Sequence, residues 1–70
     1  MSASEKQVRV RALERLLPFF RLAPDAELVG VVLDETADIP TPEFLRRCKW
    51  VLREGEHGGN LLRELRKERA

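Results

Sequence analysis

Apolar residues recur every three or four positions through most of this chain, which is the spacing of one face of an α-helix. The first such stretch covers residues 4–22 and opens with two overlapping capping boxes, Ser2-x-x-Glu5 and Ser4-x-x-Gln7. It carries two adjoining apolar stripes, which are Val10, Leu13, Leu16, Leu17 and Phe20 in one and Val8, Ala12 and Phe19 in the other.

The wide apolar coverage of this first helix predicts contacts on two of its sides. It is either the central helix of a monomer or one element of a homodimer, in which Val8 and Phe19 would form an apolar patch. Pro18 lacks the N–H group that a continuing helix needs, so we expect a kink there or a fresh start into Phe19–Leu22.

The second stretch, over residues 25–35, begins with Asp25 as its expected N-cap. Its valine-rich run over 28–33 also suits a β-strand. A lone strand needs a partner, however, and the only other alternating stretch, over residues 8–12, lies inside a strong helix pattern. We therefore predict a helix. Gly30 in its interior is about 1 kcal/mol less favourable than alanine, and we expect it to mark the close approach of another helix.

The third stretch, over 41–54, has the clearest helix start. Thr41 is the expected cap, Pro42 takes the first helical position and Gly55 supplies the stop. The fourth stretch, over 60–69, follows Asn60 as N-cap and carries a narrow stripe of Leu61, Leu62 and Leu65.

These patterns predict an all-α fold, a compact bundle of about four short helices (approximately 4–22, 25–35, 41–54 and 60–69) in a single domain, 1–70. The expected core is Leu13, Leu16, Leu17, Phe20, Leu28, Val32, Phe44, Leu45, Cys48, Val51, Leu52, Leu61, Leu62 and Leu65.

Composition limits the disulfides, metal sites and membrane segments that we expect in this domain. The single cysteine rules out an intrachain disulfide, and Cys48 and His57 are too few for a zinc site that needs about four ligands. A lone cysteine on a core stripe is typical of a reducing compartment. No run approaches the ~20 apolar residues of a membrane span, and the N-terminus lacks the apolar core of a signal peptide. We therefore expect a cytoplasmic protein without cofactor or metal.

Charge is unevenly distributed although the net charge is only +1. Residues 1–23 carry five basic and two acidic groups, residues 24–40 carry five acidic and no basic groups, and residues 41–70 carry eight basic and five acidic groups. Either the acidic middle pairs with the basic flanks inside the fold, which we favour, or the surface has two faces of opposite sign.

Catalytic chemistry finds little support. His57 stands in a glycine-flanked turn, where a solvated histidine is expected, and Cys48 faces the core. Asp34, Glu35 and Asp38 lack the spacing and the glycine of a calcium-binding loop, so we expect a solvated acidic loop. The sequence predicts a protein that is not an enzyme.

Trp50 is the most informative residue, since at about 100° per residue it points away from the apolar stripe of its helix. Its neighbours at helical spacing are basic, and together they form a candidate recognition surface of Trp50, Arg46, Arg47, Arg53 and Lys49. Tryptophan and arginine are enriched at interface hot spots. We expect binding to a protein partner with an acidic surface, unless another part of the chain covers Trp50.

The alternative is a small DNA-binding regulator that uses residues 41–54 and the basic helix ends. Against it, the connection over 35–40 is longer than a helix-turn-helix turn, and it places Glu35 and Asp38 where phosphates would run.

Overall fold

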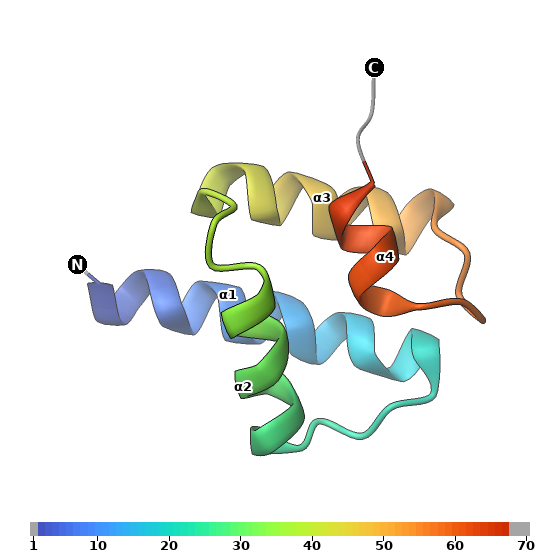
Figure 1. The fold of residues 1–70 in the computed structure, drawn as a ribbon, viewed down its shortest axis with the longest axis horizontal. Helices are drawn as coiled ribbons and strands as arrows, with labels where there is room; N and C mark the ends of the chain where they lie inside the picture. Colours follow the sequence, from blue (N-terminus) through green and yellow to red (C-terminus); the bar gives the residue numbers. More distant parts are fainter. Residues whose placement is uncertain (1, 68–70) are drawn as a thin grey trace.

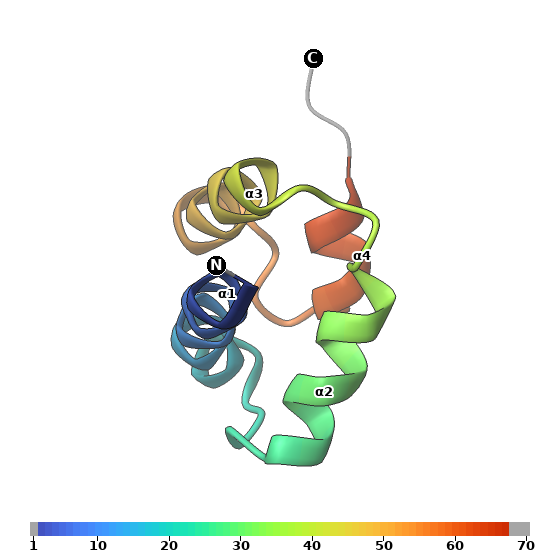
Figure 2. The same ribbon diagram turned by 90° about the vertical axis from the view of Figure 1, so that its left-hand side faces the viewer.

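A computed structural model describes residues 2–67, which form four α-helices and one 3-10 helix with no strand among them (Figure 1). The helices are α1 (Ser2–Leu16), η1 (Leu17–Phe20), α2 (Ala26–Glu35), α3 (Thr41–Glu54) and α4 (Leu61–Arg66). Figure 2 shows two layers, with α1 beside α3 in one and α2 below α4 in the other. The all-α bundle predicted from the apolar pattern is confirmed.

The break expected at Pro18 is confirmed, because α1 stops at Leu16 and the chain continues as η1. Pro18 lies in the first turn of η1, where its missing N–H does no harm. The chain then leaves the helix at Arg21, whose φ of 58° is left-handed, and the Arg21 N–H donates to the Pro18 carbonyl at 3.0 Å. The helical segment therefore ends at Phe20, and the prediction that it extends to residue 22 is wrong.

The ambiguous valine-rich run is helical, as predicted. Asp25 caps α2, and its Oδ1 accepts from the Glu27 N–H at 2.7 Å. Within the described chain, however, no helix makes the close approach predicted at Gly30. A Cβ built at Gly30 would meet nothing within 4 Å, so no other helix of the described chain approaches it.

The helix α3 covers its predicted range, but its cap lies one residue earlier than predicted. Pro40 is the N-cap and Thr41 is already helical, so Thr41 does not cap this helix. Gly55 does end α3, in an extended rather than a left-handed conformation (φ −72°). A Cβ there would lie 2.7 Å from the Val51 carbonyl oxygen, which explains the need for glycine.

The helix α4 is capped as predicted, because the Asn60 Oδ1 accepts from the Arg63 N–H at 3.0 Å. It ends at Arg66, earlier than predicted, and Lys67 has an extended backbone. The last predicted positions of this helix, 68 and 69, lie outside the described residues.

The buried core joins all five helical segments. It comprises Leu13, Leu16, Leu17, Phe20, Val29, Val32, Ile39, Phe44, Cys48, Val51, Leu61 and Leu65. Four predicted core residues, Leu28, Leu45, Leu52 and Leu62, are only partly buried around this cluster. Val29 and Ile39 were not predicted. Ile39 lies in the connection between α2 and α3, where helical periodicity does not apply.

Candidate partner-binding surface on α3

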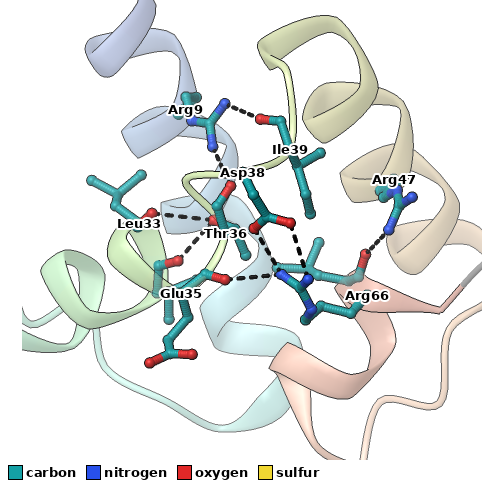
Figure 3. A network of polar contacts seen from close by, with 10 residues as sticks. Arg9, Leu33, Glu35, Thr36, Asp38, Ile39, Arg47 and Arg66 are labelled. Carbon is teal, nitrogen blue, oxygen red and sulfur yellow. Dashed lines mark hydrogen bonds and ion pairs between the residues drawn. The ribbon is translucent and has the colours of Figure 1, made fainter.

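The connection between α2 and α3 is held by an arginine from α1 (Figure 3). Arg9 donates from Nη2 to the Thr36 carbonyl at 2.8 Å, and from Nη1 to the Ile39 carbonyl at 2.8 Å and the Thr41 hydroxyl at 3.1 Å. Its guanidinium carbon also lies 4.4 Å from the ring centroid of Phe44, a cation–π distance. Arg9 thus donates to two carbonyls of the connection, of which the Thr36 carbonyl also accepts from the Ile39 N–H at 3.0 Å.

A second arginine holds the same connection from α4. Arg66 donates to both carboxylate oxygens of Asp38, at 3.0 and 3.1 Å, and to the Glu35 carbonyl at 2.9 Å (Figure 3). The Arg66 hydrogen bond lowers the pKa of Asp38, and Asp38 raises that of Arg66. Between the acidic middle and the basic flanks this is the one ion pair within residues 5–67. The five acidic residues of 24–40 are all exposed, so the favoured pairing inside the fold is limited to Asp38.

Arg47, one of the predicted recognition residues, has a structural role. Its Nε pairs with Glu43 Oε2 at 2.9 Å, and its Nη1 donates to the Leu65 carbonyl at 3.0 Å, which ties α3 to α4. Its side chain is only 21% exposed. The prediction that Arg47 forms part of an open surface is therefore wrong.

Trp50 is neither free nor fully covered. The side chain is partly buried and packs against the core cluster. Its Nε1 donates to Glu54 Oε1 at 2.9 Å, and Lys67 Nζ lies 6.0 Å from the ring centroid. The expectation of an indole projecting fully into solvent is therefore wrong, although part of the ring remains at the surface beside basic side chains.

The remaining predicted residues share one exposed face. Arg46, Lys49 and Arg53 are all exposed, and their spacing of three and four residues places them along one side of α3. Arg46 pairs with Glu43 one turn earlier and still has a side chain that is 76% exposed. We call Arg46, Lys49, Arg53 and the exposed part of Trp50 the α3 outer face.

His57 lies elsewhere and is not a solvated turn residue as predicted. It is partly buried, and its ring meets Phe19 and Phe20 edge-on with centroids 4.9 and 5.9 Å apart. Its Nε2 lies 3.0 Å from the Val51 carbonyl oxygen. The imidazole thus joins the α3–α4 turn to η1, a contact between distant segments that no local pattern signals.

The groups with perturbed pKa values do not form a catalytic constellation. Burial raises the pKa of Cys48 to about 12, as expected for a core thiol. Burial would raise the pKa of Glu64 also, but Lys67 at 3.1 Å and the Glu56 N–H at 3.3 Å outweigh it and lower that pKa. No group of three or more histidine, cysteine or acidic residues within the described chain could hold a metal ion.

Comparison of the chain with protein-family models, with curated proteins and with solved structures finds no match. Across residues 2–67, no helix combines the length and the apolar character needed to cross a bilayer.

Proposed function

We propose that this protein is a small cytoplasmic protein-binding or regulatory module that recognises an acidic surface on a partner protein through the α3 outer face. The observation that carries the proposal is the alignment of Arg46, Lys49 and Arg53 on one exposed side of α3, with the partly buried ring of Trp50 along its edge. Basic groups attract and orient an acidic partner, and an aromatic ring supplies apolar contact area.

The structure changes the expected division of roles within this surface. Since Trp50 packs against the core and donates to Glu54, it offers an already ordered ring edge rather than a free anchor. An ordered side chain loses less conformational entropy when a partner binds. The side chains of Lys49 and Arg53 make no hydrogen bond or ion pair with other described residues, so they are the groups open to a partner.

Duplex DNA is the alternative partner, and the α3 outer face is its supporting observation. In a helix-turn-helix arrangement, however, α2 would cross the phosphate backbone. The exposed groups of α2 include Glu27, Asp34 and Glu35, and no basic residue lies on it. Repulsion from phosphates opposes that geometry, so an acidic protein surface is the better-supported partner.

The test uses the double variant Lys49→Glu/Arg53→Glu and a matched control, Arg21→Glu/Arg63→Glu. Both make the same change in net charge at exposed positions. Each tagged protein is used to capture partners from its native cell extract, and captured proteins are quantified by mass spectrometry. We expect one acidic partner to be retained by wild type and control but depleted at least about tenfold by the α3 variant. Equal capture by all three would contradict the proposal.

A parallel titration tests whether duplex DNA, and not a protein, is the partner. Random-sequence duplex is added to each protein at several salt concentrations, and binding is followed by anisotropy of a dye on the DNA. Protein recognition predicts weak binding that does not distinguish the α3 variant from the control. Tight binding with a steep salt dependence, lost only in the α3 variant, would instead support DNA as the partner.

A further inference from the structure

A second surface feature lies between α1 and α2, away from the α3 outer face. It is a groove of about 310 Å³ in the corner where α2 crosses α1. Its α1 wall is formed by Lys6, Val10 and Glu14, and its α2 wall includes Val29, Gly30 and Leu33. The centre of the groove is thus apolar, and charged side chains stand at both ends of its α1 wall.

Gly30 has no structural role that the described chain explains. It lies in the interior of α2, where glycine is less favourable than alanine, and its φ is not positive. A Cβ at this position would meet open space. Because glycine has no side chain, the backbone of a second helix can come closer to α2 at Gly30 than any other residue would permit.

The charges on the α1 wall form a self-complementary pattern. Lys6 and Glu14 lie four residues to either side of Val10, on the same side of α1. If two copies of α1 meet antiparallel with a two-fold axis at Val10, Lys6 of each copy faces Glu14 of the other. Neither side chain forms an ion pair with another described residue, so both are available. A two-fold interface requires this kind of self-complementary patch.

We infer that the faces of α1 and α2 that line this groove form a dimer interface with the same faces of a second copy of this chain. The two Val10 side chains meet at the two-fold axis, and a Lys6–Glu14 pair between the copies lies at each end of the interface. Gly30 permits the second copy to come close to the α2 wall. This dimer uses the Val10 side of α1 rather than the Val8 and Phe19 patch suggested by the sequence. It leaves the α3 outer face open, so it does not depend on the proposed function.

Charge exchange gives a direct test, read as molecular mass by sedimentation equilibrium. Wild type should dimerise, whereas Lys6→Glu and Glu14→Lys each create two like-charged contacts and should weaken dimerisation by about tenfold or more. An equimolar mixture of the two variants restores opposite charges at both ends, so the mixture should dimerise as wild type does. Glutamate near the start of α1 and lysine near its end also suit the helix dipole, so folding should be preserved.

Gly30→Leu tests the close approach separately. The new side chain enters open space within one copy and favours helix, so the monomer should remain folded by circular dichroism. The dimer should nevertheless be lost. Val8→Glu, outside the groove, is the matched control and should still dimerise.

Three results would overturn the inference. The first is a wild-type protein that stays monomeric up to millimolar concentration. The second is a dimer that Lys6→Glu and Gly30→Leu leave intact. The third is a mixture of Lys6→Glu and Glu14→Lys that fails to restore the dimer.

Discussion

Arginines at the α2–α3 connection and basic residues on the α3 outer face are alike in type but differ in their surroundings. Arg9 is partly buried and donates three hydrogen bonds to the connection and the start of α3, whereas Lys49 and Arg53 are exposed. The difference follows from which side chains reach backbone carbonyls of the connection, because buried C=O groups need donors and a connection has few N–H groups to offer them. Basic residues that reach those carbonyls stabilise the fold, and the others remain free to bind.

The largest expected effect tests this contrast at Arg9. Arg9→Ala removes three hydrogen bonds and the contact with the Phe44 ring. It leaves the Ile39 carbonyl without this donor, and the Thr36 carbonyl with the Ile39 N–H alone. We expect the free energy of unfolding to fall by about 2–4 kcal/mol, measured by urea denaturation. Arg11→Ala, at an exposed position of the same helix, should change it by less than about 0.5 kcal/mol. Similar losses for both variants would contradict the contrast.

A smaller effect is expected at Arg66, which holds the same connection from its exposed side. Arg66→Ala removes the bidentate pair with Asp38 and the bond to the Glu35 carbonyl, but water can replace both. The loss of stability should be clearly below that of Arg9→Ala, and it should shrink further in high salt, which screens exposed pairs. Denaturation at low and high salt checks this, and a loss equal to that of Arg9→Ala would show that burial is not the deciding factor.

The smallest effect is expected from acid titration of the two carboxylates with lowered pKa values. Each is deprotonated more readily in the folded chain than in the unfolded chain, so each stabilises the fold above its usual pKa and loses that contribution as pH falls. Stability should therefore decline below about pH 4.5, the usual pKa of glutamate. Glu64→Gln should lower stability at neutral pH and flatten this decline, as measured by urea denaturation from pH 3 to 7. An unchanged slope would show that Lys67 and the Glu56 N–H do not hold the carboxylate in the folded state.

Helix positions were readable from the sequence because they depend on local chemistry. Apolar spacing located all four helices, and the caps at Asp25 and Asn60 were identified from their side-chain oxygens alone. Two details of the helix ends were less accurate, because only the backbone conformation decides them. The first helical segment ends at Phe20 and not at residue 22, and the cap of α3 is Pro40 and not Thr41. Ile39 escaped prediction because it is buried by a connection and not by a helix face.

The residues of the candidate site were predicted only in part, because their exposure depends on a neighbouring helix. The sequence placed Arg46, Arg47, Lys49, Trp50 and Arg53 on the polar side of a helix, which is a statement about angles. It could not tell that α4 lies beside that helix, and this neighbour covers Arg47 through the Leu65 carbonyl and approaches Trp50 through Lys67. The exposed trio of Arg46, Lys49 and Arg53 is what remains after that contact.

Residue type and spacing within a few turns were enough to predict the all-α class, the number of helices and the burial of Cys48. The packing of distant segments set which cations are internal, where His57 packs and that a groove opens beside Gly30. Those outcomes depend on which distant backbone carbonyls, rings and helices meet in space, and residue spacing along the chain does not contain that information.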